Sequence, residues 1–259
     1  MQLVVVVSPS AYLRTILERE AVAVETEASL RLLEGGVHEL CAEWAGRHLL
    51  EIFPVGAIQK RTANSGGIGI DFAVALSPKT PHAMPVIYRS MENALQRAGH
   101  KPKRRNVSLA IDLHGTEVDL VPVKRESFTS EMHELYSVRR DTVMKSNLAR
   151  NNRDIRESGR LEEIRVLKLW RDQLGLDFPS FYLELSVLAA LRGRPTGELA
   201  DNVWVTFGYL EKHFFARAAL DPSHAINLVS DELTREQKLT IRDAAAAARA
   251  MRAWSDIIA

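Results

Sequence analysis

The sequence contains few of the residues that support disulfides or transition-metal sites. Its 259 residues include a single cysteine, Cys41, which excludes an intramolecular disulfide and a cysteine-ligated zinc site. Cys41 lies in a helical pattern, where a buried structural thiol is favoured over a nucleophile. The eight histidines show neither HxH nor HExxH spacing, so a histidine-ligated zinc site is not indicated.

Long apolar runs and an excess of one charge are also missing. The opening MQLVVVV is too short for the apolar region of a signal peptide and is not preceded by basic residues. No other run approaches the roughly twenty apolar residues that span a bilayer, so we expect a cytoplasmic protein without a membrane partner. The formal net charge of +1 argues against coating nucleic acid by bulk charge, but it allows a local basic groove.

The first part of the chain shows helical spacing of apolar residues. This pattern predicts one helix over Ala11–Leu33 and a second over Val37–Leu50, with Gly35 and Gly36 between them. Pro54 would then end the second helix.

Strand patterns follow in the middle of the chain. Ile70–Leu76 predicts a strand, and Pro85–Ala98 predicts a helix closed by glycine. VSLAIDL (Val107–Leu113) and EVDLVPV (Glu117–Val123) predict a hairpin, in which Pro122 indicates that the second strand soon leaves the sheet.

From about Tyr136 the strand signals end and helical patterns dominate. These helices are expected over Leu161–Leu174, Phe181–Leu191, Leu199–Phe215 and Arg235–Ile258. The order of elements predicts an α+β protein, with residues 1–140 forming a sheet-containing core and residues 141–259 a helical domain.

Two carboxylates stand out within the strand patterns. Asp119 lies between Val118 and Leu120, so alternation places it on the opposite face from both apolar neighbours. If this strand pairs with Ile70–Leu76, Asp119 lies close to Asp71.

Several stretches together resemble a known family. VGAIQKRT, GIGIDFAVAL, VDLVPV, the helical IRVLKLWRDQLGLDFPSFYLEL and the later DPSHAINLVSDELTREQK are similar to segments of the polymerase-β-type nucleotidyltransferases. Among these the chain most resembles the bacterial cyclic-oligonucleotide synthases (CD-NTases) of anti-phage CBASS defence. The resemblance spans nearly the whole chain. It implies a mixed-sheet nucleotidyltransferase core with N-terminal helices, packed on a C-terminal helical domain.

The resemblance also implies a set of site residues. In the family, a loop of the form Gly-Ser, three residues, Gly-Thr holds phosphates, and three aspartates hold two magnesium ions for phosphoryl transfer. Carried over to this chain, the catalytic and metal-binding residues are Asp71 and Asp119. The nucleotide-binding residues are Gly56, Ala57, Lys60, Thr62, Lys168 and Tyr182.

Two of these assignments have structural alternatives. Lys168 is flanked by apolar residues in mid-helix, so its side chain could simply extend to solvent. Tyr182 lies near the position at which the family stacks the base, but an ordinary core tyrosine fits the pattern equally well.

Three departures from the family pattern fall at one place. Ala57 stands where the family has serine, Arg61 replaces the second glycine of the loop, and Gly69 replaces the first aspartate. Together they favour a degenerate active site, because the carboxylate set is one ligand short of that needed for two ions. The alternative is that Asp112 or Glu117 replaces the missing ligand.

Three functions remain open at this point. The favoured one is a non-catalytic relative that binds a nucleoside triphosphate or oligonucleotide and acts with a partner protein in defence. The second is an active nucleotidyltransferase that uses Mg or Mn, and the third is a protein-interaction module with a vestigial cleft. The basic run KPKRR (Lys101–Arg105) could contact nucleic acid, or it could be a solvated loop.

Overall fold

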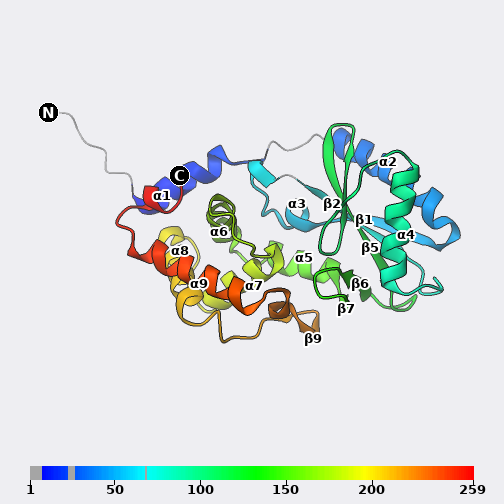
Figure 1. Ribbon diagram of the computed structural model, residues 1–259. Helices are drawn as coiled ribbons and strands as arrows, with labels where there is room; N and C mark the ends of the chain where they lie inside the picture. The colour runs from blue at the N-terminus through cyan, green and yellow to red at the C-terminus, as the bar shows by residue number, and fades with distance from the viewer. Residues whose placement is uncertain (1–7, 23–26, 68) are drawn as a thin grey trace.

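The protein is described by a computed structural model of residues 8–22, 27–67 and 69–259, in which a sheet lies beside a group of helices (Figure 1). The helices are α1 (Pro9–Arg19), α2 (Glu27–Ala45), α3 (Gly56–Lys60), α4 (Met84–Arg97), α5 (Leu148–Arg156), α6 (Leu161–Gln173), α7 (Ser180–Ala190), α8 (Leu199–Lys212) and α9 (Arg235–Ala250). The strands are β1 (Leu49–Val55), β2 (Ile70–Leu76), β3 (Lys103–Arg104), β4 (Leu109–Leu113), β5 (Thr116–Arg125), β6 (His133–Ser137), β7 (Thr142–Ser146), β8 (Leu220–Asp221) and β9 (His224–Leu228). The α+β class is confirmed.

The main sheet brings the two candidate strands together. Its order is β1-β2-β5-β4-β3, and β6 and β7 extend it from β5. β2 and β5 are parallel neighbours whose register places Asp71 opposite Asp119. The pairing that would bring the two carboxylates together is therefore present.

The two faces of the sheet differ because residues alternate along β2 and β5. Ile70, Phe72 and Val74 pack beneath α2 and α4 in one apolar core. Ala73 and Ala75 face the other side, with a smaller apolar cluster. Asp71 alternates in step with Ala73 and Ala75, so its carboxylate lies on this second face, as does that of its register partner Asp119.

The helix and strand boundaries in the N-terminal part differ from those expected. α2 continues through Gly35 and Gly36 and ends at Ala45, and Leu49 and Leu50, the last residues of the second expected helix, begin β1. Gly36 permits a close approach, since a Cβ there would lie 3.2 Å from Leu113. Pro54 is tolerated within β1 because β1 is an edge strand. Residues 23–26 of the first expected helix, and residues 1–7, lie outside the described residues.

Pro122 does not end its strand, contrary to expectation. β5 continues to Arg125, and Pro122 is the register partner of Val74 on β2. Pairing with β4 ends at Leu120, and pairing with β6 begins only at Lys124. Between those positions β5 has one partner strand, so the missing N–H of proline disrupts no second ladder.

The segment after Tyr136 is not purely helical. β7 pairs with β6, and β8 pairs with β9 in a separate two-stranded sheet. These strands have two to five residues, too few to produce a clear alternation in the sequence. The expected helices are present as α6, α7, α8 and α9, although α9 ends at Ala250.

The helical lobe has its own core, and α1 belongs to it. Leu13, Ile16 and Leu17 of α1 are buried with residues of α6 to α9. α1 also contacts the C-terminal segment, where the Tyr12 hydroxyl donates to the carbonyl of Ile258 at 2.9 Å. The division at residue 140 stays a prediction. In the described ranges no helix combines the length and apolarity needed to cross a membrane.

Candidate functional site

A cavity of about 740 Å³ lies between the sheet and the helical lobe. The sheet side contributes the ends of β1, β2 and β5 together with α3, and the helical side contributes α5, α6, α7 and the β8–β9 region. Six of the sequence-predicted residues line it, namely Gly56, Ala57, Lys60, Asp71, Asp119 and Lys168, and Gly69 lines it too. The volume falls in the range of small-molecule sites.

Gly56 fits directly against Asp71. Its φ of +74° lies in the left-handed region, and a Cβ there would stand 1.8 Å from Asp71 Oδ2. The backbone N–H of Ala57 bonds the same carboxyl group. Glycine is therefore required at residue 56 for both its conformation and its lack of a side chain.

Both aspartates have raised pKa values. Burial, followed by the nearby charge of Asp119, raises the pKa of Asp71 to about 7. Burial also raises the pKa of Asp119, although the Ser108 hydroxyl, which donates to Asp119 Oδ1 at 2.6 Å, opposes the increase. Removal from water disfavours the charged form of both carboxyl groups, and at Asp71 the neighbouring carboxylate adds to that effect.

The residues present do not fit the two-magnesium arrangement implied by the resemblance. Position 69 contributes no side chain, although a Cβ built there would lie 3.2 Å from Asp119 Oδ2. Among the described residues, no group of three or more histidine, cysteine, aspartate or glutamate side chains is placed to hold a metal ion. Two-metal chemistry requires carboxylates that bridge both ions, and Asp71 and Asp119 alone are too few.

Neither proposed replacement ligand joins the two aspartates. Asp112 is exposed at the β4–β5 turn, where it accepts a bond from the Gly115 N–H. Glu117 lines the cavity, but its carboxylate pairs with Arg105 at 2.9 Å and Lys103 at 3.6 Å.

The lysines of the cavity converge on a residue that the sequence analysis missed. Glu184 of α7 is fully buried, and its two oxygens accept from Lys60 Nζ and Lys168 Nζ, each at 2.8 Å. Burial opposes ionisation of Glu184, but the two lysines outweigh it and lower its pKa to about 2. The available signal was a single charge within the apolar run FPSFYLELSVLAAL, since a buried carboxylate needs a partner.

Lys168 does not extend to solvent. Its side chain is 5% exposed, and Nζ also donates to the Thr62 hydroxyl at 2.8 Å. Thr62 is fully buried and lies behind the cavity wall. Its position supports the lysine, so Thr62 does not reach a ligand directly.

Tyr182 and Arg61 lie away from the cavity. Tyr182 is 1% exposed and packs against Phe178 and Phe214 in the helical core, so the core alternative describes its position. Arg61 has a left-handed backbone conformation, with φ of +60°, and its side chain is exposed outside the cavity.

A second polar cluster lines the cavity around Asp221. Its carboxylate accepts from Ser146 Oγ at 2.7 Å, Asn151 Nδ2 at 3.0 Å and Asn227 Nδ2 at 3.2 Å. The backbone and hydroxyl of Ser223 add two further bonds. The sequence analysis did not select Asp221 or Asn151, because their contacts join segments 70 residues apart.

The basic run is largely neutralised. Arg104 pairs with Glu92 at 2.7 Å, while Lys103 and Arg105 share Glu117. These pairs reduce the positive charge available to a nucleic-acid backbone.

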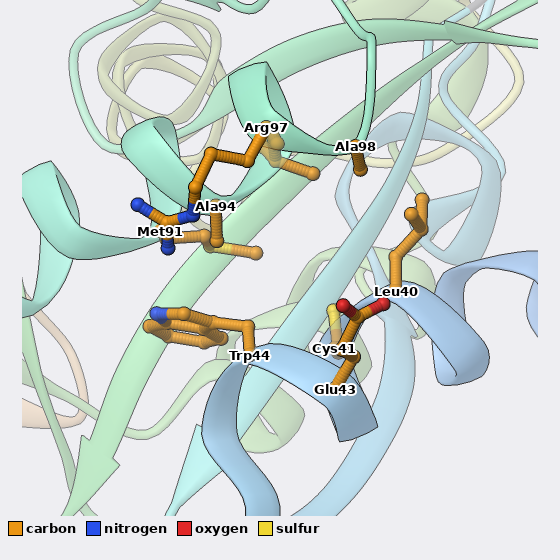
Figure 2. A pocket seen from close by; sticks show the side chains of 9 residues that line it. Leu40, Cys41, Glu43, Trp44, Met91, Ala94, Arg97 and Ala98 are labelled. Atoms are coloured by element: carbon orange, nitrogen blue, oxygen red, sulfur yellow. The ribbon is translucent and has the colours of Figure 1, made fainter.

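A smaller pocket of about 240 Å³ lies on the opposite face of the sheet, between α2 and α4 (Figure 2). Trp44, whose Nε1 donates to Ser90 Oγ at 3.0 Å, and the buried Cys41 border it. Burial raises the pKa of the Cys41 thiol to about 12, so the thiolate needed for nucleophilic chemistry is absent near neutral pH. The two aspartates and the lysines of the candidate site lie at the larger cavity.

Comparison with known proteins identifies the fold. Neither a family model nor a curated protein matches the sequence. Among solved structures, Escherichia coli MS115-1 CdnC with ATP has a TM-score of 0.75 and 18% identity, covering 94% of this chain and 91% of that one. The Bradyrhizobium diazoefficiens CD-NTase CdnG with GTP has a TM-score of 0.71 and 12% identity, covering 93% and 91%. The Cid1 poly(U) polymerase with Mg and 3'-dATP has a TM-score of 0.63 and 11% identity, covering 95% of both chains. The chain therefore has the nucleotidyltransferase fold, in a CD-NTase-like form.

Proposed function

We propose that the protein binds a nucleoside triphosphate or an oligonucleotide in the large cavity and is catalytically impaired. The observation that carries this proposal is the incomplete set of carboxylates at one end of the cavity, where Asp71 and Asp119 lie (the carboxylate end). Gly56 still fits against Asp71, and Asp119 is paired with it in register, but residue 69 is glycine. The cavity is therefore retained beside a carboxylate set that is too small for a two-ion site.

The fold and the sequence resemblance support a proposal for the biological role. The structures of CdnC and CdnG contain ATP and GTP, respectively. We infer that this chain acts in anti-phage signalling as a sensor or regulatory partner that responds to a nucleotide. Its partner protein would bind the nucleotide-bound and nucleotide-free forms with different affinities.

One observation favours a second candidate, an active nucleotidyltransferase. Glu117 lies two residues before Asp119 on β5, so both side chains lie on the same face of the strand, and both line the cavity. If Glu117 left Arg105, it would supply a third carboxylate. The enzyme would then use Mg or Mn to join nucleotides into a cyclic or linear product.

The deciding experiment is incubation with all four labelled nucleoside triphosphates and Mg or Mn, followed by product analysis. Binding of the same triphosphates is measured in parallel by calorimetry. The proposal expects binding with little or no product. Robust product that disappears in both Asp71→Asn and Glu117→Gln would contradict it and establish the second candidate, whereas absence of any binding would favour an interaction module.

A further inference from the structure

The two lysines of the cavity share one carboxylate. Lys60 comes from α3, at the candidate phosphate loop, and Lys168 comes from α6 in the helical lobe. Glu184 lies between them and accepts one bond from each ammonium group. All three residues line the cavity.

The local charge of this cluster is not balanced. Among the described residues, no other carboxylate lies within ion-pair distance of Lys60 or Lys168. Asp71 experiences the charge of both lysines from further away and forms no ion pair with either. Two buried ammonium groups with one direct partner leave an excess positive charge, which is costly unless an anion joins it.

The geometry leaves Lys60 as the group available to such an anion. Lys168 has a second partner in Thr62 and is 5% exposed, whereas the side chain of Lys60 is 11% exposed. Lys60 Nζ also lies 5.0 Å from the centre of the Phe181 ring, which lines the same cavity. A phosphate that enters the cavity can therefore contact Lys60 without breaking the Lys168–Thr62 bond.

The carboxylate end shows the opposite imbalance. A two-metal site brings positive charge to phosphates through ions that carboxylates hold, and the carboxylate set here lacks the ligand at Gly69. We propose that the Lys60–Glu184–Lys168 cluster is a metal-independent phosphate site, in which Lys60 supplies the charge that a divalent ion supplies elsewhere. This inference rests on the proposed function, because it takes the ligand of the cavity to be a nucleotide.

The first test compares ATP and adenosine by calorimetry, in EDTA and in magnesium chloride. We expect the Kd for ATP to differ by less than about threefold between the two buffers, and adenosine to bind at least about tenfold more weakly than ATP. ATP affinity should also fall as salt is raised, because ions screen the contact.

The second test removes the positive charge of Lys60. Lys60→Met leaves Lys168 and Glu184 as a balanced pair, so the variant should fold with an unchanged or higher Tm. It should bind ATP no better than adenosine. Lys212→Met, on the exposed end of α8, removes the same charge away from the cavity and should keep the preference for ATP.

The outcomes separate this inference from the proposed function. ATP binding that needs magnesium, or that survives Lys60→Met at full strength, overturns the phosphate site while nucleotide binding stands. Failure of the wild-type protein to bind any nucleoside triphosphate overturns both. A lower Tm for Lys60→Met would show that Lys60 stabilises the fold, and it would also contradict the proposed charge imbalance.

Discussion

The two ends of the large cavity differ in how their charges are arranged. At the carboxylate end, Asp71 and Asp119 are register partners on neighbouring strands, and burial raises the pKa of both. At the lysine end, Glu184 is the direct partner of two ammonium groups and has a lowered pKa. One cavity therefore has buried carboxyl groups at one end and buried ammonium groups at the other, and each neighbourhood shifts the pKa of its carboxyl groups in the opposite direction.

The largest expected effect comes from removing the shared carboxylate of the lysine end. Glu184→Gln leaves two buried ammonium groups without an anionic partner and should cost about 3–5 kcal/mol of unfolding free energy. Urea unfolding measures this loss. Glu126→Gln removes the partner of Lys145 at the exposed surface and should leave the urea midpoint nearly unchanged. Similar midpoints for the two variants would contradict the paired state of Glu184.

At the carboxylate end, Gly56→Ala tests the fit against Asp71. The new methyl group would overlap Asp71 Oδ2 and also sit at positive φ. The φ penalty alone is about 1–2 kcal/mol, and displacement of Asp71 should add to it. Gly46→Ala is the matched control, because Gly46 has φ of +50° with open space around its Cβ position. Equal losses in thermal unfolding would show that the close approach does not matter.

Restoring the missing ligand should make the carboxylate end capable of holding a metal ion. A side chain at residue 69 is directed towards Asp119, so Gly69→Asp should raise affinity for manganese by about tenfold or more. Ala57→Ser adds at most one hydroxyl contact, worth about 1 kcal/mol, so it should raise affinity less. Calorimetry with manganese on the two single variants and the double variant ranks them. No gain in any variant would indicate a more deeply remodelled cleft.

The carboxylate end should also show a pH dependence at Asp71. Its pKa is near 7 in the folded protein and about 4 when unfolded, so the folded state holds the proton more tightly. The resulting stability is fully present below pH 4 and is lost as the pH rises towards 7. Asp71→Asn removes this term, so the Tm difference, variant minus wild type, should increase from pH 5 to pH 8. A difference that decreases with pH would mean that Asp71 is ionised and paired.

Local patterns were sufficient for part of this architecture. Alternation in GIGIDFAVAL and VDLVPV predicted the strands, and their pairing in register brought Asp71 beside Asp119. β1 was not predicted, because Pro54 normally interrupts a strand and only its place at the sheet edge makes proline acceptable. Gly36 was interpreted as the end of a helix, because glycine is unfavourable inside helices. In the structure it lies within α2 and allows that helix to approach Leu113 of the sheet closely.

Residue identity alone shows that position 69 offers no carboxylate and position 57 no hydroxyl, because Gly69 and Ala57 are read directly from the chain. The tertiary structure sets which polar groups line the cavity and what they contact. Lys60 and Glu184 are 124 residues apart and Asn151 and Asp221 are 70 apart, so no local period relates them. Tyr182 and Lys168 likewise fit either a core or a ligand position by pattern. Burial and ion pairing depend on contacts between the sheet and the helical lobe. These contacts also determine the free energy of each buried charge.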